Sequence, residues 1–150
     1  MNNNIDPILI ETDHFLFKTP SGWQTEKLGD EAELLGPNEE FMVISSYHID
    51  KNSTKDELTI FCQDICNAMI AASEDPDLMV NQSLKKEVTP NSLPVWKLLS
   101  QTIDNEAYYD QYLAIQNNIA VVITIEGDLE NRASSALVEE SVYCIDFKAN

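Results

Sequence analysis

Residues 95–126 decide the fold of this chain, and they read VWKLLSQTIDNEAYYDQYLAIQNNIAVVITIE. Three runs rich in β-branched and aromatic residues, 95–103, 107–115 and 119–126, are separated by short polar segments. Asp104-Asn105 and Gln116-Asn117-Asn118 have the composition of hairpin connections. The stretch therefore predicts a three-stranded antiparallel meander.

The last of these runs belongs in the centre of the sheet. Ile119-Ala120-Val121-Val122-Ile123 is apolar at every position and shows no alternation with polar residues. Such a run is typical of a strand that is covered on both faces. We therefore expect Gly127-Asp128 to end a central, fully buried strand.

Further strands are expected on the N-terminal side of the meander. They cover residues 8–10, 14–17, 24–28, 31–35, 41–49 and 79–88. Pro20-Ser21-Gly22-Trp23 predicts a turn, because proline fixes one backbone dihedral and glycine permits a positive one. We expect Trp23 to anchor the packing beside this turn. Residues 144–147 form either a short closing strand or an extended tail.

A first helix is predicted from Thr54 to about Ser73. Thr54-Lys55-Asp56-Glu57 has the spacing of a capping box, in which the threonine hydroxyl and the glutamate carboxylate satisfy free amides. Apolar side chains then recur every three or four residues and form one stripe. The stripe consists of Leu58, Phe61, Cys62, Ile65, Cys66 and Met69.

A second helix is predicted after the meander, with Asp128 as its N-cap and an end near Tyr143. Ala133, Ala136 and Leu137 are expected to face the core, in a weaker stripe than that of the first helix. The predicted order is strands, helix, meander, helix. It indicates an α+β domain, an antiparallel β-sheet with a central meander that is packed by two main helices. Residues 1–7 are expected to be a flexible N-terminus, and residues 8–150 a single domain.

The charge is strongly unbalanced, with 26 Asp and Glu against 9 Lys and Arg and a formal net charge of -17. Arg132 is the single arginine. A negative surface repels nucleic acid, anionic membranes and anionic substrates, and it accelerates encounter with a basic partner. The sequence therefore favours a basic protein partner and argues against nucleic acid and membrane binding.

The first residues lack the basic and apolar regions of a signal peptide, and no apolar run has membrane-spanning length. These features predict a cytoplasmic protein. Cys62, Cys66 and Cys144 have no metal-site spacing and are expected to be buried small side chains in a reducing compartment.

No catalytic motif is present: the sequence contains no nucleophile elbow, P-loop or glycine-rich dinucleotide fingerprint. Adjacent acids at Glu39-Glu40, Asp56-Glu57 and Glu139-Glu140 are expected to face solvent. His14 and His48 are expected to be structural. We therefore predict a non-enzymatic protein without a cofactor or a metal site.

One strand face offers a candidate partner-binding surface. Tyr108, Asp110 and Tyr112 alternate along the strand, and Trp96 lies on the neighbouring one. Tyrosine contributes contact area and a hydroxyl, and aspartate pairs with lysine or arginine. The alternative, that these aromatic side chains fill the core, is more common for strands.

Several segments resemble the PsbP-like superfamily. Phe15-Leu16-Phe17-Lys18-Thr19-Pro20-Ser21-Gly22-Trp23 is similar to its opening strand and tryptophan turn. The resemblance continues in Glu33-Leu34-Leu35-Gly36-Pro37, in Thr54-Lys55-Asp56-Glu57-Leu58, and in the terminal helix that runs into Cys144-Ile145-Asp146-Phe147. It implies an α/β/α sandwich over roughly residues 8–148.

The superfamily contains adaptor and binding proteins with different partners, among them a nuclear import factor that binds Ran and bacterial DcrB-type domains of unknown function. One bacterial branch acts as chaperones for toxins exported by type VI secretion. The resemblance brings no catalytic motif to this chain, and fold analogy alone does not assign a function.

Three hypotheses follow. The first is a bacterial immunity or inhibitor protein that neutralises a basic toxin. The second is a chaperone or adaptor for a type VI secreted effector, which predicts an apolar groove on the sheet and a homodimer. The third is an enzyme on an acidic scaffold, which predicts a buried carboxylate or histidine with a perturbed pKa in a cleft.

Overall fold

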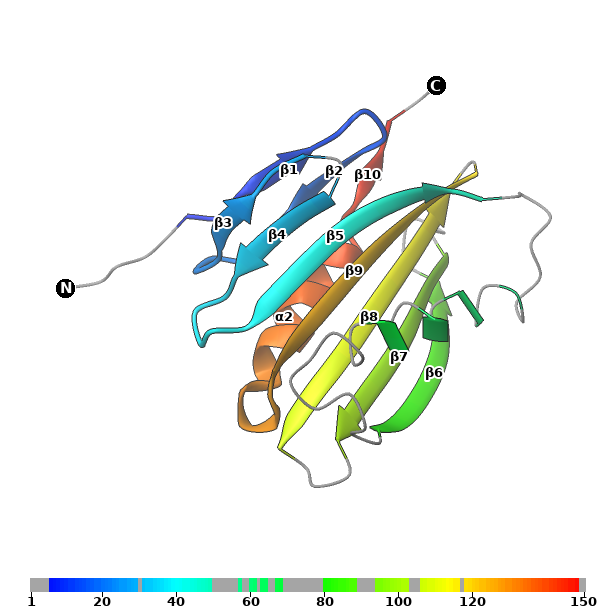
Figure 1. The fold of residues 1–150 in the computed structure, drawn as a ribbon. Helices are drawn as coiled ribbons and strands as arrows, with labels where there is room; N and C mark the ends of the chain where they lie inside the picture. The colour runs from blue at the N-terminus through cyan, green and yellow to red at the C-terminus, as the bar shows by residue number, and fades with distance from the viewer. Residues whose placement is uncertain are drawn as a thin grey trace.

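The structure is a computed structural model that describes most of the chain (Figure 1). The described residues are 6–29, 31–49, 57, 60, 61, 63, 64, 67, 68, 80–88, 94–102, 106–116 and 118–148, and for 80–88 and 94 only the backbone is described. Ten strands form two antiparallel sheets among these residues.

The larger sheet has seven strands, and each pairs antiparallel with its neighbours. Their spatial order is β3 (Gln24–Lys27), β4 (Glu31–Leu35), β5 (Phe41–His48), β9 (Ile119–Asp128), β8 (Ala107–Gln116), β7 (Pro94–Thr102) and β6 (Val80–Val88). The predicted meander is confirmed as β7, β8 and β9. Strand β9 lies in the middle, and its residues 119–125 are buried on both faces, as its continuous apolar run predicts.

The smaller sheet joins residues from the two ends of the described chain. Its order is β1 (Leu9–Glu11), β2 (Phe15–Lys18) and β10 (Asp146–Phe147). Phe147 lies opposite Phe15, and Asp146 lies opposite Leu16. The segment after the last helix is therefore a closing strand, one of the two alternatives that the sequence left open.

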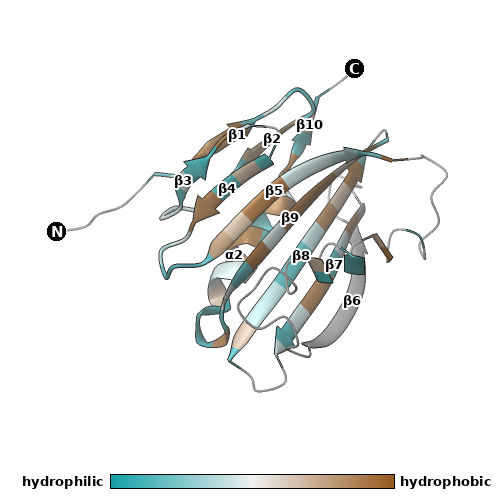
Figure 2. Cartoon of the chain, in the orientation of Figure 1, coloured by the Kyte–Doolittle hydropathy of each residue, from teal (hydrophilic) through white to brown (hydrophobic). Residues whose placement is uncertain are grey.

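Two hydrophobic clusters cover the two faces of the larger sheet. The first joins β2, β4, β5, β8 and β9 to α2 (Ala133–Val142), which lies behind the sheet in Figure 1. Trp23 belongs to this cluster and is buried, so its predicted packing role is confirmed. The second cluster contains Trp96, Leu98, Tyr109, Leu113, Ala120 and Val122. Figure 2 shows hydrophobic colour along β5 and β9, and hydrophilic colour where β9 leads into the segment before α2.

The expectation of a sheet packed by two main helices is wrong as a description of this chain. Strands in two sheets dominate the described residues, and α2 is the one α-helix whose bounds these residues define. Within the first predicted helix, seven separate positions from 57 to 68 are described, and these are helical. Phe61 is one of them, and it packs on the sheet face opposite α2. Residues 54–56 of the capping box and the predicted end at 73 lie outside the described residues.

The second helix also begins and packs differently from the prediction. A 3-10 turn, η1 (Leu129–Asn131), precedes α2, and the side chain of Asp128 makes no cap hydrogen bond. Ala133, Ala136 and Leu137 are exposed, whereas Ser134, Ser135, Val138 and Val142 are buried. The helix is rotated from the predicted orientation because Ser135 forms hydrogen bonds with Asp110 and Tyr112 of β8. Hydrophobicity alone does not reveal such a partner.

Candidate functional site

The four predicted partner-binding residues are all buried, and they do not share a surface. Tyr108, Asp110 and Tyr112 lie on the sheet face that α2 covers, with exposed fractions of 0%, 1% and 1%. Trp96 belongs to the cluster on the opposite face. The geometry therefore favours the alternative from the sequence, in which these side chains fill the core.

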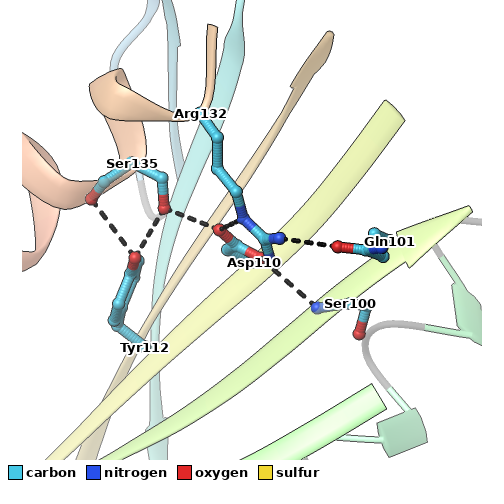
Figure 3. Close-up of polar contacts among 6 residues, drawn as sticks. All are labelled: Ser100, Gln101, Asp110, Tyr112, Arg132 and Ser135. Carbon is cyan, nitrogen blue, oxygen red and sulfur yellow. Dashed lines mark hydrogen bonds and ion pairs between the residues drawn. The ribbon is translucent and has the colours of Figure 1, made fainter. Parts of the chain in front are cut away.

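A polar network connects β7 and β8 to the start of α2 (Figure 3). The Arg132 guanidinium donates to both Asp110 carboxylate oxygens, with Nε–Oδ2 at 3.1 Å and Nη2–Oδ1 at 2.6 Å. Its Nη1 donates to Gln101 Oε1 at 3.0 Å. The Ser135 hydroxyl donates to Asp110 Oδ2 at 2.8 Å, and the Tyr112 hydroxyl lies 2.5 Å from Ser135 Oγ.

This network gives the buried Asp110 charge a full set of partners. The backbone amide of Ser100 also donates a hydrogen bond to Asp110 Oδ1, at 3.3 Å. The hydrogen bond to Asp110 raises the pKa of Arg132, and burial raises the pKa of Tyr112. A charge that is bidentate and fully hydrogen-bonded is stable in a low-dielectric interior. The network therefore explains how the core holds a carboxylate.

The neighbouring end of the sheet is different, and we call it the acidic end. It comprises the exposed acids Glu39, Glu106, Asp128 and Glu130 together with the half-buried Glu126. The strands bring them together, because Ala107 lies opposite Asp128 and Phe41 lies opposite Glu126. A pocket of about 200 Å³ opens here. Its lining includes Glu39, Phe41, Tyr108, Glu126, Gly127 and Asp128.

The turn before β5 shapes this end. Glu39 has a φ of 66°, in the left-handed region that non-glycine residues rarely adopt. The next residue, Glu40, is fully buried and accepts the Asn38 amide on Oε1 at 2.6 Å. The expectation that Glu39 and Glu40 both face solvent is therefore wrong for Glu40. A turn that folds a side chain back onto its own backbone buries an acid that a sequence pattern places outside.

Two polar atoms at this end lack hydrogen-bond partners within the described part of the chain: Glu40 Oε2 and the Tyr108 hydroxyl. Gly127 separates them, since a Cβ there would lie 3.0 Å from Glu40 Cγ and 3.1 Å from the Tyr108 hydroxyl oxygen. An unmet buried polar group costs about 1–3 kcal/mol. Burial, and then the Glu40 charge, raise the pKa of Tyr108.

Glu126, at the same end of the sheet, is also affected by burial, which raises the pKa of its carboxyl group. In both Glu126 and Tyr108, burial therefore favours the neutral form of the side chain.

The described surface as a whole has far more acids than bases. Thirteen Asp and Glu residues are exposed: Asp6, Glu11, Asp13, Glu26, Glu31, Glu39, Glu57, Asp64, Glu106, Asp128, Glu130, Glu140 and Asp146. Among the bases whose side chains the structure describes, Lys18 and Lys27 are exposed. The other three of these form ion pairs: Lys97 with Glu139, Arg132 with Asp110 and Lys148 with Glu11. Glu139 is thus paired, whereas the sequence predicted a solvated side chain.

The two histidines meet, although they are far apart in the sequence. His14 precedes β2 and His48 ends β5, and their ring centroids lie 5.2 Å apart in an edge-to-face arrangement. They line a polar pocket of about 540 Å³ together with Glu11 and Asp13. This contact joins the segment before β2 of the smaller sheet to the end of β5 in the larger one, and no sequence spacing could have shown it.

Other features concern metal sites, cysteines and membranes. Among the described residues, no group of three or more His, Cys, Asp or Glu side chains is arranged to hold a metal ion. Cys144 is exposed, contrary to its predicted burial, because it follows the last turn of α2. Cys62 and Cys66 lie outside the described residues. No described helix is long and apolar enough to cross a membrane.

Comparison with known proteins gives the fold. No family model matches the chain, and no curated protein matches it. Among solved structures, it is similar to the solution structure of cyanobacterial PsbP (CyanoP) from Synechocystis sp. PCC 6803, with a TM-score of 0.65 and 11% sequence identity. The likeness covers 89% of this chain and 86% of that chain. The chain therefore has a PsbP-like fold, as the sequence resemblance implied.

Proposed function

We propose that this chain is a non-enzymatic, acidic protein-binding module of bacterial origin that neutralises a basic protein partner such as a toxin. The proposal depends on one observation: among the side chains that the structure describes, thirteen carboxylates and two lysines are exposed, and the other three bases are held in ion pairs. Such a surface steers a cationic protein toward it and discourages anionic ligands. A cytoplasmic location is part of this proposal.

The acidic end is the part of this surface that we expect to meet the partner. Five acids gather there: Glu126 and Asp128 on β9, Glu130 on η1, Glu39 in the turn before β5, and Glu106 just before β8. Arg132 is close, but its donors are directed to Asp110 and Gln101. The negative charge of this end is therefore available to a partner.

A second candidate is a chaperone or adaptor for a type VI secreted effector. The resemblance to bacterial DcrB-type domains favours it, and so does a depression of about 320 Å³ beside α2, where Leu137 is 54% exposed. Such an adaptor would hold an apolar segment of its effector and would form a homodimer. Binding through an apolar surface persists at high salt, whereas steering by charge weakens.

The test uses the full chain and a lysate of its native host. Bound proteins are eluted with a salt gradient, and the main basic protein is identified by mass spectrometry and purified. Its association rate is then measured with wild type and with the triple variant Glu39→Gln, Glu126→Gln, Asp128→Asn. The matched control, Asp13→Asn, Glu140→Gln, Asp146→Asn, makes the same charge change at three exposed acids outside the acidic end.

We expect the triple variant to lower the association rate about tenfold at low salt, and the control to lower it less. A partner that binds equally to both variants and stays bound at high salt would favour the chaperone hypothesis. Absence of any salt-sensitive basic partner would contradict the proposed neutralising function.

A further inference from the structure

We propose that the face of β4 and β5 opposite α2 is a docking surface for a part of the basic partner in which an apolar side chain is flanked by lysine or arginine. This inference rests on the proposed function and deepens it, because it names the chemistry that the partner presents. We call the apolar side chains of this surface, Leu35, Phe41 and Val43, the β4–β5 patch. The face is turned toward the viewer in Figure 1, where α2 lies behind the sheet.

The strand register places the three side chains of the patch next to one another. Leu35 lies opposite Phe41, and Val43 follows two residues later on β5, so all three share one face of the sheet. Phe41 and Val43 lie opposite Glu126 and Thr124 of β9. The same face continues across β9 and β8 into the hydrophobic cluster that lies opposite α2.

The cover over this face does not extend across β4 and β5. Along β8 and β9 its side chains are buried, each at most 7% exposed: Tyr109, Gln111, Leu113, Val122 and Thr124. In the patch, Leu35 is 38% exposed, and Phe41 and Val43 are partly exposed. A contiguous apolar surface with a polar rim is typical of protein interaction sites.

The two faces of the same strands differ, which shows that the patch is not a general property of this edge of the sheet. On the α2 face the side chains of β4 and β5 are at most 4% exposed: Ala32, Leu34, Met42 and Ile44. These two strands therefore pack fully into the core on one side and keep apolar surface in contact with solvent on the other.

Carboxylates surround the patch. Glu33 lies opposite Val43 on β4, and Glu126 lies opposite Phe41 on β9. Glu39 lines the pocket of about 200 Å³ together with Phe41 and Glu126, so the patch adjoins the acidic end. Lys27 is the one base in the sequences of β3, β4, β5 and β9. Such a rim attracts an apolar contact that carries positive charge beside it and repels one that carries negative charge.

The side chain of Glu126 supports a cationic occupant at the border of the patch. It is half-buried, and burial raises the pKa of its carboxyl group. A nearby cation stabilises the charged form of such a carboxyl group, and thus offsets the solvation that burial removes. The described part of the chain shows no ion pair that involves Glu126, and Arg132 donates to Asp110 and Gln101.

The experiment is an NMR titration of the ¹⁵N-labelled full chain with three short peptides. The probe is acetyl-lysyl-leucyl-lysine amide. Acetyl-lysyl-seryl-lysine amide keeps the charge and lacks the apolar side chain, and acetyl-glutamyl-leucyl-glutamate amide keeps the apolar side chain and reverses the charge. We expect saturable shifts of the Leu35 and Val43 amides with the lysyl-leucyl probe, a weaker response to the seryl peptide, and none to the glutamyl peptide.

Variants with matched controls test the apolar contact and the charge separately. Leu35→Thr and Val43→Thr remove apolar surface and keep strand-forming side chains, and each is expected to weaken probe binding about threefold. Leu9→Thr makes the same change at an exposed leucine of β1 and should leave binding unchanged. Glu33→Gln is expected to weaken binding about twofold at low salt, whereas Glu140→Gln on α2 should not. Amide dispersion in the same spectra shows whether each variant is folded.

The outcomes separate this inference from the proposed function. Absence of a saturable shift at Leu35 and Val43 overturns the docking surface even if a basic partner is captured in a salt-sensitive way. Equal binding of the seryl peptide overturns the role of the β4–β5 patch, and equal binding of the glutamyl peptide overturns the choice of a cationic occupant. Saturable binding of the lysyl-leucyl probe by a chain that captures no basic partner supports the docking surface and contradicts the proposed function.

Discussion

The network beneath α2 and the acidic end both contain buried carboxylates, and both involve Tyr108 or its neighbours on β8. At Asp110, every oxygen has a donor from Arg132, Ser135 or the Ser100 amide. Near the acidic end, one oxygen of Glu40 and the Tyr108 hydroxyl have no hydrogen-bond partner within the described part of the chain, and burial raises the pKa of Glu126. The difference separates polar groups whose burial is compensated by hydrogen bonds from polar groups whose burial is not.

The largest expected effect on stability comes from breaking the ion pair between Arg132 and Asp110. Arg132→Met leaves Asp110 buried without its cation, and breaking a buried pair is far costlier than breaking a surface pair. We expect a loss of about 3 kcal/mol in the free energy of unfolding, measured by urea denaturation. The control Lys148→Met removes the more exposed pair with Glu11 and should cost less than about 1 kcal/mol. Equal losses in the two variants would refute the distinction.

A smaller effect comes from the two serines at the start of α2. Ser135→Ala removes the hydroxyl between Asp110 and Tyr112 and should cost about 1–2 kcal/mol. Ser134→Ala is the matched control, because Ser134 is similarly buried but takes no part in the network. If the two variants unfold at the same urea concentration, the hydroxyl of Ser135 contributes nothing specific.

Removal of the Tyr108 hydroxyl is expected to change the free energy of unfolding in the opposite direction. Tyr108→Phe removes a buried hydroxyl without a partner in the described chain, so stability should stay the same or rise by about 0.5 kcal/mol. Tyr112→Phe, the matched variant on the same strand, loses the contact with Ser135 and should destabilise by about 1 kcal/mol. Thermal or urea unfolding of the pair decides the point, and a loss in Tyr108→Phe would mean that its hydroxyl is satisfied.

The smallest effect appears in the pH dependence. Burial raises the pKa of folded Glu126 above its ordinary value of 4.5, so the folded state keeps a proton that the unfolded state has released. The folded state therefore loses stability as pH rises from 4.5 through the raised pKa. Glu126→Gln removes this loss, so its gain over wild type should be larger at neutral pH than below pH 4.5.

The control for this titration is Glu130→Gln, which makes the same charge change at an exposed acid of the same end. It accounts for the general relief of repulsion on a strongly negative chain. A pH dependence that is identical in the two variants would show that the burial of Glu126 has no energetic consequence.

The sequence predicted the parts of this molecule that depend on local pattern. The meander, the central place of β9 and the packing of Trp23 followed from apolar runs and turn residues. The orientation of α2 did not follow from local pattern. Ser135 of this helix is buried because it donates a hydrogen bond to Asp110, which lies on β8. Burial of Glu40 was missed because it depends on one turn whose backbone reverses at Glu39.

The candidate site was even less visible in the sequence. Tyr108, Asp110 and Tyr112 were correctly grouped on one face, but period-two alternation does not tell which face of a sheet is covered. Glu126 and Gly127 were passed over as the end of a strand. One signal was present: acids at Glu126, Asp128 and Glu130 follow a long apolar run without a basic residue among them.

The pairing of β2 with β10 also has a consequence for the order in which the chain folds during translation. Phe15 finds its partner Phe147 only after every strand of the seven-stranded sheet has left the ribosome. The larger sheet can therefore assemble first, while β1 and β2 still lack their third strand, β10. We expect a nascent chain that is exposed outside the ribosome only up to residue 145 to hold a formed central meander and an N-terminal hairpin that proteases still reach.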